Sequence, residues 1–155
     1  PAAMVGCFAY GDTALIERYV EGVEVAVSVV DLGDGPFALP AVEIVPDEGV
    51  YDYAARYTAG HTEFFAPARL SPAAAAACAE TAVTAHTALG LRDLSRTDLI
   101  VDATDTPQFL EVNVAPGMTE TSLLPMAAEA AGRDLGDLCR ALLQIAANRP
   151  RSPKS

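Results

Sequence analysis

Basic residues are scarce in this chain. Lys and Arg together account for 10 of its 155 residues, against 21 Asp and Glu, so the formal net charge is −11. Nucleic acids and anionic membranes are bound through clustered Lys and Arg. The composition therefore argues against nucleic acid and against a membrane surface as partners.

Cysteines and long apolar runs are also scarce. Cys7, Cys78 and Cys139 are an odd, widely spaced set without a Cys-x-x-Cys motif, which argues against a disulfide framework and against a zinc site. Polar residues interrupt each apolar run before the roughly 18 residues of a spanning helix, and the start carries no export signal. We therefore expect a protein of the reducing cytoplasm, long enough for one domain with its own core.

Apolar alternation and turn residues predict strands followed by helices. Strands are expected at 14–20, 23–30, 37–45 and 62–66, with Pro40 marking an edge or an irregularity in the third. Helices are expected from Pro72 to the stop at Gly90, from Thr121 or Ser122 to Ala131, and after the cap Asp134. The last helix carries an apolar stripe, expected to be core, of Leu135, Leu138, Cys139, Leu142 and Ala146. This order indicates an α+β fold.

Residues 95–113 predict a β-hairpin with polar side chains gathered on one face. Opposed residues of an antiparallel pair project to the same side, and their residue numbers have a constant sum. A loop of two or four residues centred on Thr104-Asp105 makes that sum 209, which sets Asp98 opposite Glu111 and Arg96 opposite Asn113. Because a loop of odd length would mix charge into an apolar face, we expect an even loop.

The chemistry of this face indicates a cation. Two opposed carboxylates repel each other, and Asp98, Glu111 and the Asn113 carbonyl are hard oxygen donors, typical of Mg²⁺ or Mn²⁺ shared with a phosphate. The Arg96 guanidinium suits a phosphoryl oxygen. In the alternative interpretation, Arg96 only neutralises two acids on a solvated face of the sheet.

The segment after the hairpin adds a longer motif. Residues 116–119 read Pro-Gly-Met-Thr, and Ser122-Leu123 follows just before the expected helix. The order of these motifs resembles the carboxy-terminal part of the D-alanine:D-alanine ligases of the ATP-grasp superfamily. The order is Arg-x-Asp, a hairpin, Glu-x-Asn, Pro-Gly-Met-Thr and Ser-Leu. The resemblance implies an ATP-grasp carboxy-terminal subdomain, in which an antiparallel sheet is flanked by helices.

The resemblance implies a ligase that joins two D-alanines into D-alanyl-D-alanine for peptidoglycan synthesis, with ATP and an acyl phosphate. Asp98, Glu111 and Asn113 would hold a pair of Mg²⁺ or Mn²⁺ ions that bridge the phosphates. Arg96 would be catalytic by stabilising charge at the acyl carbon and the transferred phosphoryl group.

Two further segments acquire roles by resemblance. Glu17 would bind the adenine amino group, the backbone from Arg18 to Val20 would bracket the ring, and Glu24 would bind the ribose. In the aromatic loop, Arg56 would contact phosphate and Tyr57 would be a catalytic residue that favours D-alanine as second substrate. The alternative for 17–24 is a solvated strand face on which acid and base alternate.

The second D-alanine would bind at a helix N-terminus. By resemblance, the Ser122 hydroxyl and the Leu123 N–H would hold its carboxylate, and Gly117 would line the pocket of the intermediate. A helix N-terminus suits this role because its first N–H groups lack partners and point at the anion.

The resemblance also predicts the organisation of the chain. Residues 1–148 would be the carboxy-terminal portion of an ATP-grasp domain and residues 149–155 a disordered tail. We expect the chain to lack ligase activity without the family's amino-terminal and central parts, and a homodimer is a further expectation for the full-length protein. Two alternatives stay open: an ATP-grasp ligase for another amino acid or hydroxy acid, and a non-catalytic domain that binds a divalent ion or a partner.

Overall fold

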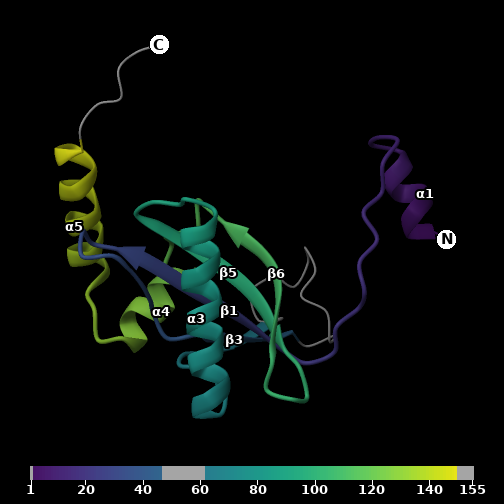
Figure 1. Cartoon of the computed structure of the whole chain (residues 1–155), viewed down its shortest axis with the longest axis horizontal. Coiled ribbons are helices and arrows are strands. Elements are labelled where there is room, and N and C mark those ends of the chain that lie inside the picture. The colour runs from purple at the N-terminus through teal and green to yellow at the C-terminus, as the bar shows by residue number, and fades with distance from the viewer. Residues whose placement is uncertain (1, 47–61, 150–155) are drawn as a thin grey trace.

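One antiparallel sheet with helices on both faces forms the body of the molecule (Figure 1). The computed structural model describes residues 2–46 and 62–149. The strands are β1 (Val23–Asp31), β2 (Pro36–Ala38), β3 (Val42–Pro46), β4 (Thr62–Phe65), β5 (Leu94–Val101) and β6 (Pro107–Asn113). The helices are α1 (Ala2–Phe8), α3 (Pro72–Ala88), α4 (Leu123–Ala130) and α5 (Leu135–Asn148). The expected α+β class is confirmed.

β1 is the central strand of the sheet. The strand order is β4-β3-β1-β5-β6, every pairing is antiparallel, and β2 pairs with the last residues of β1. The residues from Val25 to Val30 are all buried. A strand that reads as a nearly unbroken run of Val and Ala is suited to this position, because helices cover both of its faces.

α3 covers one face of the sheet. The core on this side comprises Val25, Val27, Val29, Leu99, Val101, Ala74, Cys78 and Ala82. The buried positions of α3 recur every four residues, and the first three, Ala74, Cys78 and Ala82, carry small side chains that let the helix lie close to the strands. Ser71 caps the helix by accepting the Ala74 N–H at 3.1 Å, and Pro72 begins it, as expected.

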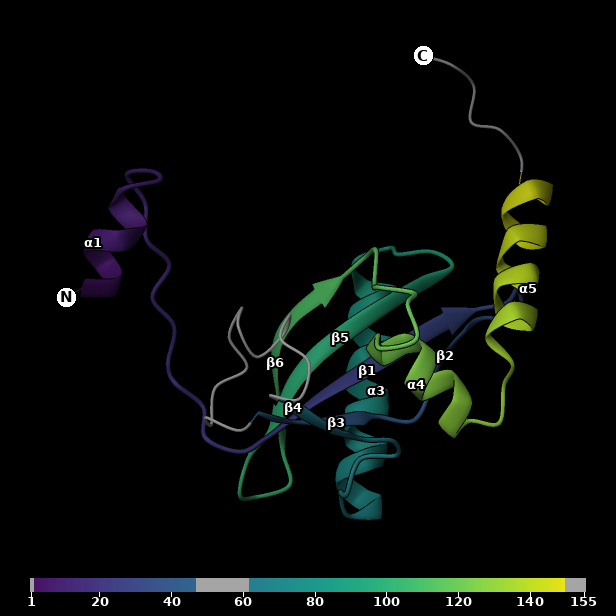
Figure 2. The same ribbon diagram turned by 180° about the vertical axis from the view of Figure 1, so that it is seen from behind.

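α4 and α5 lie on the opposite face (Figure 2). Their core comprises Ala26, Val30, Leu39, Val42, Ile44, Leu123, Leu124, Ala127, Ala128, Leu138 and Leu142. The predicted stripe of α5 is only partly core, because Leu138 and Leu142 are buried whereas Ala146 is exposed. The far end of α5 extends past the sheet (Figure 1), which leaves Ala146 exposed.

The strand expected at 37–45 is interrupted at Pro40, where an irregularity was predicted. β2 pairs with residues 29–31 of β1 and β3 with residues 25–26, so both pieces follow the same neighbour. Between them the Leu39 N–H donates to the Ser28 carbonyl at 2.8 Å. Proline has no N–H for the ladder, so the strand breaks there and resumes.

Residues 14–20 do not form a strand, contrary to the prediction. Leu15, Ile16 and Tyr19 are 81, 74 and 81% exposed, and none of the described strands pairs with this segment. An alternating pattern becomes a strand only when a neighbour satisfies its backbone N–H and C=O groups. The segment therefore remains outside the sheet.

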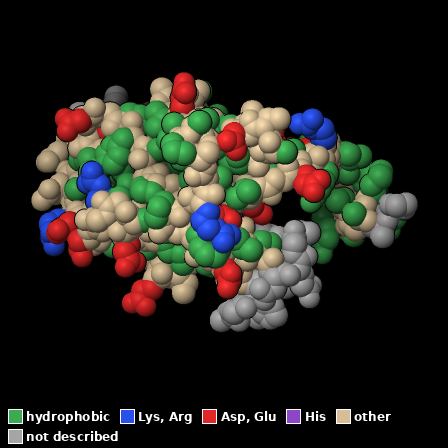
Figure 3. All heavy atoms as spheres, turned by 90° about the horizontal axis from the view of Figure 1, so that it is seen from below, with side chains coloured by type: hydrophobic (Ala, Val, Ile, Leu, Met, Phe, Trp, Pro, Cys, Tyr) green, Lys and Arg blue, Asp and Glu red, His purple; other side chains and the backbone are tan. Residues whose placement is uncertain are grey.

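α1 was not predicted, and it stands apart from the sheet (Figure 1). Met4, Val5 and Phe8 are 44, 71 and 51% exposed, so apolar side chains dominate this end of the molecule (Figure 3). Nowhere in the described ranges 2–46 and 62–149 is a helix both long and apolar enough to cross a membrane.

Candidate metal and nucleotide site

The register of the β5–β6 hairpin brings the predicted polar residues together. Asp98 lies opposite Glu111, and Arg96 lies opposite Asn113, as predicted. On the other side of β5, Asp98 lies opposite Ala26 of β1, whose side chain is part of the core beneath α4. The polar groups therefore share the face of the sheet that carries α4 and α5.

The loop of this hairpin differs from the prediction. Residues 102–106 join the strands, which is an odd loop, and Val101 pairs with Pro107. A β-bulge between Asp98 and Leu99 then leaves Leu110 of β6 without a directly opposed residue and restores the expected pairs beyond it. The parity argument gave the right pairs with the wrong loop, because a bulge adds one residue to one strand.

Arg96 and Asp98 form a two-point ion pair. The Arg96 Nε donates to Asp98 Oδ1 at 2.7 Å, and Nη2 donates to Oδ2 at 2.8 Å. The two side chains are only 11 and 8% exposed. Residues two apart on a strand point to the same face, which places the guanidinium beside the carboxylate. This geometry is the strongest form of Arg–carboxylate contact.

The other two members of the site lie on β6. Glu111 is exposed, and Asn113 is half-buried with its Oδ1 accepting the Ala115 N–H at 2.9 Å. That hydrogen bond turns the chain after the strand and leads it toward α4. Asn113 is thus held at the point where the sheet meets the loop that precedes this helix.

The donor set fits a hard divalent cation better than zinc. Within the described ranges no three His, Cys, Asp or Glu side chains cluster as a metal site would require. The candidate set is instead two carboxylates and one amide oxygen, from Asp98, Glu111 and Asn113. Mg²⁺ is commonly held by one or two carboxylates with phosphate and water completing its shell, so these residues fit such an ion.

A cluster of hydroxyl groups lies just before α4. Ser122 accepts the Thr119 N–H at 3.2 Å, and the two hydroxyls are 2.8 Å apart. Ser122 is the N-cap of α4 but makes no side-chain cap hydrogen bond. A Cβ on Gly117 would lie 2.6 Å from Ser122 Oγ, so a larger residue there would displace this hydroxyl. The three predicted substrate residues Gly117, Ser122 and Leu123 are therefore neighbours.

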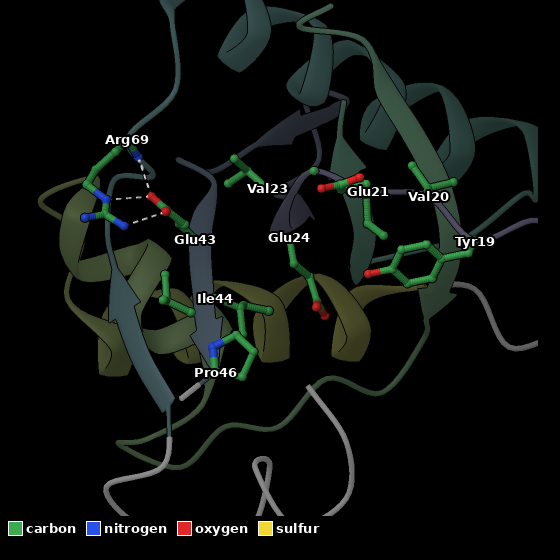
Figure 4. A pocket seen from close by; sticks show the side chains of 12 residues that line it. Tyr19, Val20, Glu21, Val23, Glu24, Glu43, Ile44, Pro46 and Arg69 are labelled. Carbon is green, nitrogen blue, oxygen red and sulfur yellow. Dashed lines mark hydrogen bonds and ion pairs between the residues drawn. The ribbon is translucent and has the colours of Figure 1, made fainter. Parts of the chain in front are cut away.

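A cavity of about 550 Å³ lies beside the start of β1 (Figure 4). Val20, Glu24 and Ile100 line it, and Ile100 lies opposite Glu24 in the sheet. Glu24 therefore shares the face of Asp98. Glu17 and Arg18 are exposed and do not line this cavity. Of the predicted adenine and ribose residues, the structure places Val20 and Glu24 on one cavity and the other two outside it.

Two residues that line this cavity were missed at the sequence level. The Glu43 carboxylate accepts hydrogen bonds from Arg69 Nε at 2.9 Å, from its Nη2 at 2.7 Å and from its backbone N–H at 3.0 Å (Figure 4). Hydrogen bonding by Arg69 lowers the pKa of Glu43, although burial acts in the opposite direction. The guanidinium also lies 3.5 Å from the Phe65 ring centroid. A glutamate inside the apolar run 41–45 was the signal, since a buried acid requires a partner.

Comparison with known proteins gives the family of the chain. Residues 1–144 match the model of the family described as D-ala D-ala ligase C-terminus. The chain belongs to this family. The D-alanine–D-alanine ligase of Anaeromyxobacter dehalogenans strain 2CP-C is 47% identical over 138 residues, which cover 89% of this chain and 44% of that protein. The chain therefore spans less than half the length of this relative.

Solved structures support the fold of a D-ala D-ala ligase C-terminus. The D-alanine–D-alanine ligase of Bacillus anthracis superposes with a TM-score of 0.75 at 27% identity, covering 92% of this chain and 46% of that one. The D-Ala:D-Ser ligase VanG of Enterococcus faecalis gives 0.71 at 29% identity, covering 83% and 37%. The ATP-grasp carboxy-terminal fold expected from the sequence is thereby confirmed.

Several residues predicted by family resemblance lie outside the described ranges. Arg56 and Tyr57 fall within 47–61, and the tail predicted for 149–155 lies outside them except for its first residue. Arg149 itself follows α5 and pairs with Asp93. The remaining members of the predicted site lie on β1, β5, β6, the segments beside them and the first residue of α4.

Proposed function

We propose that this chain is the carboxy-terminal portion of an ATP- and Mg²⁺-dependent ligase that joins two D-alanines through an acyl phosphate, in peptidoglycan synthesis. Membership of the D-ala D-ala ligase C-terminus family supports the reaction class. The single observation that carries the proposal is the register that sets Asp98 opposite Glu111 and Arg96 opposite Asn113. It gathers oxygen donors and a guanidinium on one face of the sheet.

In this proposal Asp98, Glu111 and Asn113 hold Mg²⁺ or Mn²⁺ together with the phosphates of ATP. Such an ion, when bound, neutralises phosphate charge during phosphoryl transfer. Arg96 stabilises negative charge on the transferred phosphoryl group and at the acyl carbon. The carboxylate of the first D-alanine attacks the γ-phosphate of ATP, and ADP leaves. The amine of the second D-alanine then attacks the acyl phosphate, and inorganic phosphate leaves, so the protein supplies position and charge rather than a nucleophile.

The second D-alanine binds through its carboxylate in the hydroxyl cluster before α4. Ser122 donates its hydroxyl proton and Leu123 its N–H, while Gly117 leaves room beside them. The absence of a side-chain cap on α4 supports this role, because Ser122 is not committed to the first turn of the helix. The positive end of the helix dipole adds to the attraction.

The adenosine part of ATP lies over the cavity lined by Val20 and Glu24. Glu24 accepts hydrogen bonds from ribose hydroxyls, and the backbone from Arg18 to Val20, with Glu17, brackets the adenine. Arg56 and Tyr57 keep the roles that resemblance implies, phosphate contact and selection of D-alanine. ATP as a substrate also supports the predicted cytoplasmic location, and the homodimer stays a prediction for the full-length protein.

A different second substrate is the main rival. The likeness to the D-Ala:D-Ser ligase VanG, at 29% identity, supports a ligase that uses D-serine. Tyr57 and the Ser122-Leu123 pair favour D-alanine by resemblance. Comparing kcat/KM for D-alanine, D-serine and D-lactate as second substrate separates these activities.

A chimera tests the proposal. Residues 1–144 of this chain replace the matching region of the Anaeromyxobacter relative, and phosphate release is followed with ATP, Mg²⁺ and D-alanine. We expect D-alanine-dependent release that Asp98→Asn reduces on the order of a hundredfold. Asp137→Asn, a change at an exposed acid of α5, should leave the rate unchanged.

The isolated chain provides the second arm of the test. We expect it to show no turnover and to bind ATP only when Mg²⁺ is present, measured by calorimetry. An inactive chimera together with a chain that binds no nucleotide would contradict the proposed ligase. Mg²⁺-dependent binding of ATP excludes the alternative of a domain that binds only a partner protein.

A further inference from the structure

The Arg96 guanidinium is hydrogen-bonded to the carboxylate of Asp98, which the proposed metal site requires as a ligand. It donates to both oxygens of Asp98, at 2.7 and 2.8 Å, and the pair is almost fully buried. A divalent cation needs a lone pair of the same carboxylate. Two cations beside one buried carboxylate also repel each other, so the guanidinium and the ion compete for Asp98.

The sheet leaves room for the guanidinium to lie along β5. Directly across from Arg96 and Asp98 on β1 are Ser28 and Ala26, both small and both 1% exposed. On the other side lie Asn113 and Glu111 of β6. The Arg96–Asp98 ion pair therefore has small side chains of β1 on one side and the two remaining proposed metal ligands, on β6, on the other.

There is also a physical reason for the Arg96–Asp98 ion pair to form when no ligand is bound. A buried carboxylate without a positive partner is strongly disfavoured, and Asp98 is 6% exposed. An arginine fits a carboxylate at two points and retains its charge at any physiological pH. Arg96 thus satisfies Asp98 until another cation replaces it.

We propose that Arg96 is the resident cation of the metal site and is exchanged for the divalent ion when metal and nucleotide bind. The exchange releases the guanidinium from Asp98 and makes it available to the phosphoryl group. Metal binding therefore precedes the catalytic use of Arg96, which orders the two events at one carboxylate. This inference rests on the proposed function, since it assigns a gating contact to the same site.

Mn²⁺ binding to the 155-residue chain tests the exchange without any turnover. Free Mn²⁺ is measured by electron paramagnetic resonance, with Mn²⁺ alone as the probe. Arg96→Gln removes the competing charge and the two-point contact with Asp98, so it should bind Mn²⁺ about tenfold more tightly than the wild type. Arg96→Lys keeps the charge without the two-point contact, so its Mn²⁺ affinity should lie between those of the wild type and Arg96→Gln.

Arg140→Gln is the matched control, because it removes an equal charge from an exposed Arg–Asp pair on α5. It should bind Mn²⁺ as the wild type does. Equal or weaker binding by Arg96→Gln, in a protein that does bind Mn²⁺, would overturn the exchange and leave the metal site intact. No saturable binding by the wild type or by Arg96→Gln would contradict the metal site of the proposed function itself.

A measurement on the wild type covers the case in which the variant fails to fold. The Nε–H signal of Arg96 is assigned by its loss in Arg96→Lys, and its exchange with water is followed by NMR during titration with Mg²⁺. Saturation is judged from the amide signals of Glu111 and Asn113. We expect faster exchange of the Arg96 Nε–H at saturation, and unchanged protection there would refute the exchange.

Discussion

The imidazole Nδ1 of His86 and the hydroxyl of Ser95 lie 2.8 Å apart and share a hydrogen bond between α3 and β5. His86 is 2% exposed, and its Nε2 has no hydrogen-bond partner in the part of the chain that the structure describes. Burial lowers the pKa of His86 below its usual 6.5, while the charges of Asp31 and Asp93 act in the opposite direction. His86 is therefore a neutral core residue that connects α3 to the strand of the candidate site.

This burial predicts a loss of stability in weak acid. Above pH 6.5 His86 is neutral in both states, and as the pH falls below 6.5 the unfolded chain binds a proton that the folded chain resists. Stability should fall over that window until the lowered pKa is reached. Urea unfolding between pH 7.5 and 5 should show a smaller decline in His86→Gln than in the wild type. Parallel curves would contradict the role of His86.

The Glu43–Arg69 pair predicts a second, more acidic transition. Arg69 lowers the pKa of Glu43 from 4.5, so this contribution to stability is present above pH 4.5 and is lost as the pH falls below it. Arg69→Gln should lower the unfolding midpoint at pH 7 and flatten the profile below pH 4.5. Arg140→Gln, which alters an exposed pair, should do neither. A midpoint at pH 7 identical to that of the wild type would rule out a structural role for the pair.

Two serines at helix starts should differ in how much stability is lost on substitution by alanine. Ser71 caps α3 by accepting the Ala74 N–H and also donates to Asp105 Oδ2 at 2.7 Å, so Ser71→Ala should destabilise the chain by about 1 kcal/mol. Ser122 makes no side-chain cap to α4, and its hydroxyl bonds to Thr119 are exposed, so Ser122→Ala should change stability less. Denaturant unfolding of both variants compares them. A larger loss in Ser122→Ala would show that its hydroxyl is structural.

Gly22 lies against the end of β5 at the rim of the cavity. A Cβ there would lie 2.2 Å from the Val101 carbonyl oxygen and 2.8 Å from Ile100 Cγ2. Because backbone cannot yield as a flexible side chain does, Gly22→Ala should lower stability by about 1–3 kcal/mol. Gly11→Ala is the control, since a Cβ added at Gly11 would meet nothing within 4 Å. Equal thermal midpoints for the two variants would refute the close approach.

The hydrogen bonds of the hairpin loop predict how the pKa of Asp102 responds to a substitution. Asp102 accepts hydrogen bonds from the Thr104 hydroxyl at 2.6 Å and from the Thr104 N–H at 2.9 Å, and these contacts lower its pKa to about 2. Thr104→Val removes the hydroxyl and should raise the pKa of Asp102 toward 3.8. NMR titration of the side-chain carboxyl measures both values. An unchanged pKa would show that the loop forms without this contact.

The Asp102 contacts also show why the sequence predicted the pairs of the hairpin but not its loop. The hydrogen bonds around Asp102 favour a loop with an odd number of residues, whereas the polar face requires Asp98 opposite Glu111. Both demands are met only through the bulge at Leu110. Each signal is local, and their conflict is resolved by packing of the whole sheet.

The amino-acid sequence by itself determined the position of β1, the break at Pro40, the caps of α3 and α5 and the opposed pairs of the hairpin. These features depend on residue type and on short spacing, so they can be inferred before the chain is folded. Only the tertiary structure decided that 14–20 has no strand to pair with, that Glu43 meets Arg69 across 26 positions, and that Arg96 lies on Asp98. Those outcomes depend on which polar groups are buried next to each other and must therefore pair, and the packing of the sheet and its helices decides which groups these are.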